Sequence, residues 1–267
     1  MSPRAGLALL AFVGAIACGE LVAWLGRAGE DASPTAMLGA TLAGHGALGR
    51  LAVAGAAFVP GGDPVGRLGL RPGRLGSRAV AWAVVGTVAL SHALHRLLAL
   101  LALREQGALG RVDRLVESAS QAPAGLTLAL VAIALVAPVV EEVLFRGLLL
   151  RSLRRLGGAL AVGISAAAFG LFHMDPIQGS AAFLLGLYLG AVALWAGSAR
   201  PAIACHLANN VFGVVTAGLG LSGASPGTAW IALPLLALAA LALQRTRRDA
   251  DGTPPPEPAA TADLPEG

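Results

Sequence analysis

The sequence predicts an all-α, polytopic membrane protein with about eight transmembrane helices. Hydrophobic residues make up 56% of the chain and charged residues 13%, whereas a soluble domain usually carries about 25% charged residues. The apolar residues are gathered in runs long enough to cross a bilayer as helices. Short arginine-rich segments separate several of these runs, which is typical of the cytoplasmic loops of membrane proteins.

The predicted spans follow the apolar runs in order. The first run imitates a signal peptide, but it is long enough to span a bilayer, and we interpret it as an uncleaved helix. We expect spans over residues 5–25, 36–58, 79–103, 126–150, 158–173, 177–196, 202–221 and 229–243. We divide the chain into N-terminal helices and loops over 1–123, a core over 124–243 and a disordered tail over 244–267, which is rich in Pro, Ala and acidic residues.

Composition and charge limit the possible partners and the orientation. The aromatic residues are too few and too scattered for a base-stacking surface, so we expect no nucleic acid partner. The two cysteines are far apart and both lie in apolar runs, which speaks against a disulfide framework or a cysteine-based zinc site. The arginines recur in alternate loops, and this pattern predicts that both termini are cytoplasmic.

Two adjacent carboxylates and an arginine interrupt the fourth apolar run. Charges at membrane depth are costly and are functional by default. Glu142 and Arg146 are separated by four residues with the acid first, which is the favourable order for an ion pair on a helix. Glu141 is rotated by about 100° from Glu142, so its partner must come from elsewhere. Pro138, just before the pair, should kink or locally open the helix.

Two further polar pairs lie downstream, each with four-residue spacing and therefore on one helix face. They are Phe169 with His173 and His206 with Asn210. Glu141 and His173 lie almost equally far from the Gly-Gly turn at 157–158, roughly 24 Å at 1.5 Å per residue. An antiparallel helix pair would therefore bring them to the same level. The depth of His206 does not follow from such a count.

A cluster of this kind suits hydrolysis of a peptide bond inside a membrane cavity. A carboxylate removed from water is a competent general base, and a neighbouring histidine can orient the water. A second histidine and an amide N–H can stabilise an oxyanion. Alternatively, Glu141, His173 and His206 could ligate a zinc ion with a water in the fourth position. The sequence therefore leaves the cofactor open between none and a single zinc ion.

Other polar residues offer weaker candidates. His92, His95 and Arg96 share one face of the third span and form a rival cluster that could line the site or bind a metal. We interpret His45 as polar packing or pore lining. Cys205 is next to His206, but adjacent helix residues point about 100° apart, which disfavours it as a nucleophile.

The three motifs, in this order, resemble those of the CAAX protease and bacteriocin-processing (CPBP, or Abi) family of intramembrane proteases. They are Glu-Glu-x-x-x-Arg at 141–146, Phe-x-x-x-His at 169–173 and His-x-x-x-Asn at 206–210. The resemblance covers about residues 124–221 and shows no departure within the motifs. It implies an eight-helix membrane fold and a glutamate-dependent endopeptidase.

The resemblance also implies a role for each motif residue. In the prenyl-protein-processing members of the family, the residues that match Glu141 and His173 activate water, and those that match His206 and Asn210 stabilise the oxyanion. Glu142 and Arg146 are expected to support the site, and we interpret Phe169 as a cavity wall. The expected partners are the lipid bilayer and a membrane-associated protein or peptide substrate.

The remaining expectations concern location and an alternative function. The short core and the Ala/Gly/Arg-rich composition suggest a bacterial inner (plasma) membrane. The alternative to a protease is a non-catalytic immunity or transporter-like membrane protein that uses the same polar cavity to bind a ligand.

Overall fold

The computed structural model describes residues 33–58, 63–103, 106–122, 124–223 and 226–252. These residues form helices and their connections, and none of them is in a strand, so the all-α fold is confirmed. The principal single helices are α2 (Pro34–Phe58), α4 (Ser77–Leu100), α9 (Gly158–Phe172), α10 (Pro176–Ala196), α11 (Arg200–Gly218) and α12 (Ala232–Asp251). The shorter elements include α3 (Pro64–Arg67), α5 (Ala108–Ser120) and the 3-10 helix η5 (Pro226–Ile231).

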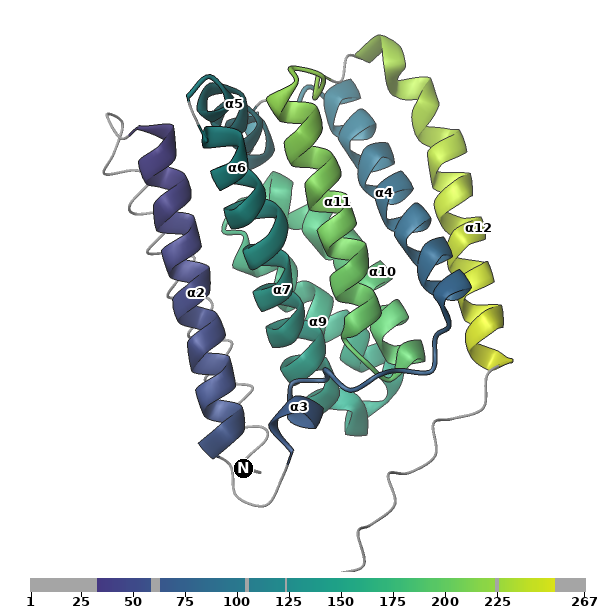
Figure 1. The fold of residues 1–267 in the computed structure, drawn as a ribbon. Coiled ribbons are helices and arrows are strands. Elements are labelled where there is room, and N and C mark those ends of the chain that lie inside the picture. The colour runs from purple at the N-terminus through teal and green to yellow at the C-terminus, as the bar shows by residue number, and fades with distance from the viewer. Residues whose placement is uncertain (1–32, 59–62, 104–105, 123, 224–225, 253–267) are drawn as a thin grey trace, which may run out of the picture.

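The long helices form a bundle with α2 at one edge and α12 at the other (Figure 1). The helix that carries the glutamates lies between α2 and α11, and α4 lies between α11 and α12. Helices α9 and α10 pack against each other behind this row. The glutamates are therefore enclosed by helices that come from both halves of the chain.

Four helical stretches are long and apolar enough to cross a membrane. They are Ser77–Leu100, Gly125–Leu156, Pro176–Ala196 and Gly227–Asp251. Helix α9 is apolar but shorter, while α2 and α11 lie where spans were expected but are less apolar. The chain is therefore an all-α membrane protein. Eight spans remain a prediction, and the first of them lies outside the described residues.

The glutamate-bearing helix is not a uniform α-helix. It consists of α6 (Gly125–Ala129), the π-helix η2 (Leu130–Val136), α7 (Ala137–Glu142), the π-helix η3 (Val143–Leu150), α8 (Arg151–Leu153) and the 3-10 turn η4 (Arg154–Leu156). Pro138 lies in the first turn of α7 and has no N–H to donate, so the normal hydrogen-bond ladder cannot continue through it. The predicted local opening is found as the π-helix η2 just before α7. A second π-helix, η3, follows α7, and π-helical segments are frequent at functional sites.

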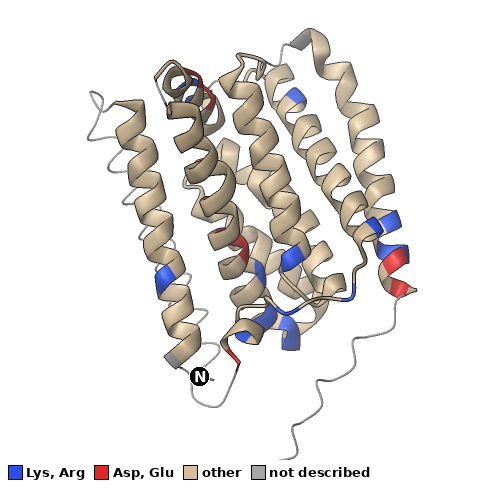
Figure 2. Ribbon diagram, viewed as in Figure 1, with Lys and Arg blue, Asp and Glu red and all other residues tan. Residues whose placement is uncertain are grey.

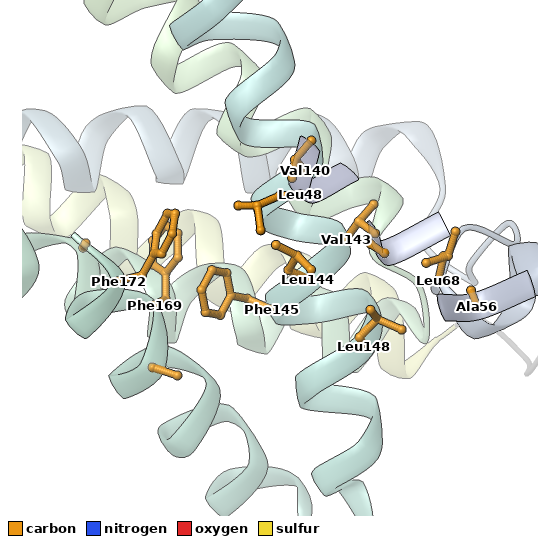
Figure 3. Packing of buried hydrophobic residues seen from close by; sticks show 13 residues of the cluster. Leu48, Ala56, Leu68, Val140, Val143, Leu144, Phe145, Leu148, Phe169 and Phe172 are labelled. Carbon is orange, nitrogen blue, oxygen red and sulfur yellow. The ribbon is translucent and has the colours of Figure 1, made fainter. Parts of the chain in front are cut away.

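An apolar cluster fixes the glutamate helix between α2 and α9 (Figure 3). Leu48 and Ala56 reach it from α2, and Phe145 joins it from η3. The ring of Phe145 packs against those of Phe169 and Phe172, with centroids 5.2 and 5.6 Å apart. Between membrane helices such contacts act through van der Waals packing rather than through removal of apolar surface from water, and this cluster packs the helices together at the level of the site.

The basic loop after α3 closes one end of the bundle. The carbonyl oxygen of Gly69 accepts a hydrogen bond from the amide of Ala199 (2.9 Å), and that of Arg71 accepts one from the hydroxyl of Ser198 (2.7 Å). The loop thereby holds the turn between α10 and α11. Figure 2 shows that most of the arginines gather at this end of the molecule.

The C-terminal helix is longer than the apolar run that predicts it. Helix α12 continues to Asp251, whereas the predicted disordered tail begins at residue 244. The last turns of the helix are polar. Within them Thr246 is buried and its hydroxyl bonds the carbonyl oxygen of Ala242 at 2.9 Å. The division into three regions remains a prediction, and residues 253–267 lie outside the described part of the chain.

Candidate active site

Five of the seven predicted site residues line one cavity of about 1090 Å³ inside the bundle, and Glu142 and Arg146 are not among its lining residues. The cavity is bounded by side chains from α2, α4, α5, η2, α7, α9, α10 and α11. The predicted site residues that line the cavity are Glu141, Phe169, His173, His206 and Asn210. The structure therefore brings together in one space groups that lie in three separate motifs.

Glu141 lies on α7 and is only 7% exposed. Its Oε1 is 3.1 Å from Nε2 of His45, and its Oε2 is 3.9 Å from Nε2 of His206. The sequence predicts that Glu141 has a partner from another part of the chain, and His45 on α2 is that partner. His45, interpreted as polar packing or pore lining, does line the cavity, and its side chain also makes a direct hydrogen bond to the central carboxylate.

Glu142 and Arg146 form the predicted ion pair. The Nη1 of Arg146 donates to Oε1 of Glu142 at 2.8 Å, and both side chains are fully buried. Nη2 donates to the carbonyl oxygen of Gly186 on α10 (3.1 Å), and the guanidinium carbon lies 4.5 Å from the centre of the Phe169 ring. The pair thus connects the glutamate helix to both α9 and α10. Phe169 also lines the cavity, as expected of a cavity wall.

His206 reaches the level of the glutamates, which sequence counting left open. Its Nδ1 lies 2.9 Å from Oε1 of Glu142. Helix α11 begins at Arg200, only a short distance along the chain, so the turn between α10 and α11 must lie close to the site. The hydrogen bonds of that turn to the loop after α3 hold it there.

Hydrogen bonds fix which nitrogen each imidazole presents to Glu141 or to the cavity. Nδ1 of His45 and Nδ1 of His173 each lie within 3.0 Å of the backbone carbonyl oxygen four residues earlier. A carbonyl oxygen only accepts hydrogen bonds, so both Nδ1 atoms carry the proton. Nδ1 of His206 faces a carboxylate oxygen that already accepts from Arg146, so it also carries a proton. In His173 and His206, Nε2 is therefore the nitrogen left for chemistry, whereas Nε2 of His45 already bonds Glu141.

His173 occupies the end of α9, where the chain turns toward α10. Asp175 follows it and caps α10 by accepting from the amides of Ile177 (3.0 Å) and Gln178 (2.8 Å). The other carboxylate oxygen accepts from the amide of Ala108 and from Arg111. Burial would raise the pKa of Asp175, but these hydrogen bonds outweigh it and hold the pKa below its ordinary value of 3.8. Asp175 thus attaches α5 to the segment next to His173.

Asn210 faces the cavity on α11. Its Nδ2 donates to the carbonyl oxygen of Ile133 at 3.0 Å, and Nδ2 of Asn209 donates to its Oδ1 at 3.2 Å. Ile133 belongs to the π-helix η2, so the irregular backbone supplies the acceptor. The amide group of Asn210 has two N–H bonds, and this arrangement leaves the second one available to a bound substrate.

The rival cluster on α4 lines another part of the same cavity. The ring of His92 packs edge-on against Phe212 with centroids 4.6 Å apart, and Arg96 donates to the hydroxyl of Thr228 at 2.6 Å. These residues therefore share the cavity with Glu141 but are held by other partners. Cys205 is fully buried and is not among the residues that line the cavity.

The described residues do not fit a metal site. Among them, no group of three or more His, Cys, Asp or Glu side chains is arranged to hold a metal ion. Nε2 of His45 and Nδ1 of His206 instead face the two glutamates directly.

Residues 123–212 match the family model described as type II CAAX prenyl endopeptidase Rce1-like. This segment contains all three motifs and ends just after Asn210. It belongs to the CAAX protease family. No curated protein sequence and no solved structure is significantly similar to the chain.

The segment that matches the CAAX protease family supplies only part of the cavity lining. It covers the helices that carry Glu141, His173 and His206, whereas α2 and α4 precede it. His45 and the cluster on α4 therefore belong to the part of the cavity that the family match does not reach.

Proposed function

We propose that this protein is an intramembrane endopeptidase that hydrolyses a peptide bond in a membrane-associated protein or peptide. The observation that carries the proposal is the setting of Glu141. Its carboxylate is buried, lines a cavity large enough for a peptide segment, and shares that cavity with three imidazoles whose Nδ1 atoms are already committed. Membership of the segment 123–212 in the CAAX protease family supports the same reaction class.

In the proposed reaction, Glu141 and Nε2 of His173 hold a water between them. Glu141 takes one proton from this water as its oxygen attacks the carbonyl carbon of the scissile bond. The resulting tetrahedral intermediate carries a negative oxygen. Glu141 then gives the proton to the leaving nitrogen as the C–N bond breaks, which restores the carboxylate and releases an acid and an amine.

We assign stabilisation of the negative oxygen to His206 and Asn210. Since Nδ1 of His206 already donates to Glu142, Nε2 can donate to the intermediate only when the ring is an imidazolium. Asn210 would contribute its second amide N–H. Such donors commonly account for 10²- to 10³-fold in kcat each.

The substrate is expected to enter from the bilayer and to carry an apolar anchor. The cavity walls include Met37, Leu109, Ile133 and Leu185, which suit an apolar chain better than a charged one. We also propose that the protein resides in a bacterial inner membrane with both termini in the cytoplasm. The gathering of basic residues at one end of the bundle supports this orientation.

Reconstituted protein tests the reaction. Wild type and Glu141→Gln are placed in liposomes with a quenched fluorescent peptide that ends in an S-farnesylated CAAX sequence, the substrate type in the family description. Cleavage by wild type and loss of cleavage in the variant are expected. Normal cleavage by Glu141→Gln would exclude the mechanism. Wild type that binds a ligand in the cavity but cleaves no membrane peptide would favour an immunity or transporter-like function.

A further inference from the structure

We infer that His45 is a positioning residue that orients the Glu141 carboxylate for attack by water. The inference rests on the proposed function and adds a residue from α2, which lies outside the segment that matches the family model. His45 is separated from Glu141 by 96 positions in the chain, yet Nε2 and Oε1 are 3.1 Å apart.

Both nitrogens of His45 are engaged, so the ring has one orientation. Nδ1 bonds the carbonyl oxygen of Thr41 at 3.0 Å, one turn earlier on the same helix. Phe172 packs edge-on against the ring with centroids 6.4 Å apart. The side chain is 8% exposed. A ring fixed in this way presents Nε2 to Glu141 at a defined position and angle.

The bond with His45 determines where the two oxygens of Glu141 point. Among the described residues it is the one hydrogen bond within 3.5 Å that this carboxylate makes. The terminal torsion of a glutamate is broad and has no strong preference of its own. With Oε1 held by His45, Oε2 is turned toward His206, 3.9 Å from its Nε2. Oε2 is thus the oxygen left to accept a proton from water.

The expected effect is on the chemical step. A misplacement of a reacting group by about 1 Å can cost on the order of 100-fold in rate. Removing the His45 ring should therefore lower kcat by about 10- to 100-fold, while KM changes less than threefold because Glu141 rather than His45 meets the scissile bond. Glutamine places an amide nitrogen near the position of Nε2, so His45→Gln should recover part of the loss.

The test compares His45→Ala, His45→Gln and Leu51→Ala in liposomes with the farnesylated CAAX peptide used above. Leu51 is on the same helix and is 65% exposed, so its variant controls for changes in α2 and should keep wild-type kcat. The inference predicts the order wild type, Gln, then Ala in kcat. Equal kcat in wild type and His45→Ala, or no recovery with His45→Gln despite normal folding, would overturn it.

A spectroscopic measurement examines the bond without relying on activity. In protein labelled with 15N-histidine, the Nε2 resonance of His45 should shift in Glu141→Gln and stay unchanged in Asp63→Asn, which alters the cap of α3. An unchanged resonance in Glu141→Gln would overturn the inference whether or not the protein is a protease. If the resonance shifts but wild type cleaves no peptide, the proposed function fails and the role of His45 in water attack fails with it.

Discussion

Nδ1 of His206 lies 2.9 Å from Oε1 of Glu142, and the same oxygen accepts a hydrogen bond from Arg146 at 2.8 Å. Glu142 therefore determines the tautomer of His206 as well as neutralising a buried arginine. From the sequence, Glu142 was expected to support the site only through its ion pair with Arg146. The structure extends that support to one of the proposed oxyanion donors.

Removing Glu142 should destabilise the fold severely. Glu142→Ala leaves the fully buried guanidinium of Arg146 without its anion, and breaking a buried pair in this way costs about 3–5 kcal/mol. The loss is measured as a lower midpoint of thermal unfolding in detergent micelles. Arg200→Ala, which removes an exposed arginine, is the matched control and should change the midpoint little. Equal midpoints for both variants would contradict the assigned role.

Gly147 should be intolerant of a side chain, because the basic loop lies directly against it. A Cβ there would stand 2.2 Å from the carbonyl oxygen of Leu68. We expect Gly147→Ala to displace the loop and to cost about 1–3 kcal/mol of stability, as overpacking commonly does.

Gly163 provides the control for this substitution. It lies inside α9, and a Cβ would meet nothing within 4 Å. Gly163→Ala should therefore be neutral or stabilise the helix by about 0.5–1 kcal/mol. Unfolding midpoints and limited proteolysis of the loop compare the two variants. Equal behaviour would show that the loop does not depend on Gly147.

The two adjacent asparagines should differ in their kinetic effects. If Asn210 donates to the oxyanion, Asn210→Ala lowers kcat on the order of 10²- to 10³-fold. Asn209 donates to Oδ1 of Asn210 and only orients it, so Asn209→Ala should cost about tenfold or less. The measurement is the initial rate of peptide cleavage at saturating substrate. A larger loss for Asn209→Ala would reverse the assignment.

Asp175 should make the attachment of α5 sensitive to acid. Its pKa is lower in the folded protein than in the unfolded chain, so its contribution to stability is complete above about pH 4 and is lost as the pH falls through the folded value. At pH 7, Asp175→Ala should lower stability by about 0.5–2 kcal/mol through loss of the helix cap.

The difference between wild type and Asp175→Ala should shrink when unfolding is measured at pH 3 instead of pH 7. Hydrogen exchange of the Ala108 amide, which donates to Asp175, reports on the same attachment. A difference in stability that is constant from pH 7 to pH 3 would show that the charge of Asp175 is not involved.

The sequence predicted those parts of the site that depend on local spacing. The Glu142–Arg146 pair follows from four-residue spacing on a helix, and the opening around Pro138 follows from its missing N–H. The equal distances of Glu141 and His173 from the Gly-Gly turn correctly anticipated that both would line one cavity. Each inference needed one helix or one hairpin.

The parts that the sequence could not predict depend on packing between distant helices. His45 is an ionisable residue that interrupts an apolar run, and that alone was a signal. Its rotation and depth relative to Glu141, however, depend on how α2 packs against α7, which local periodicity does not determine. The depth of His206 likewise depends on the loop after α3, whose backbone hydrogen bonds hold the turn before α11.

The role of Glu141 is tested most directly by membrane proteomics of cells that produce wild type or Glu141→Gln at equal levels. Glutamine keeps the size of the side chain and can still bond His45, but it cannot take a proton from water. We predict that at least one membrane-associated protein accumulates as an uncleaved precursor in the Glu141→Gln cells and is processed in wild type. Identical processing of every detected membrane protein in the two strains would contradict the proposal that Glu141 activates water for peptide hydrolysis.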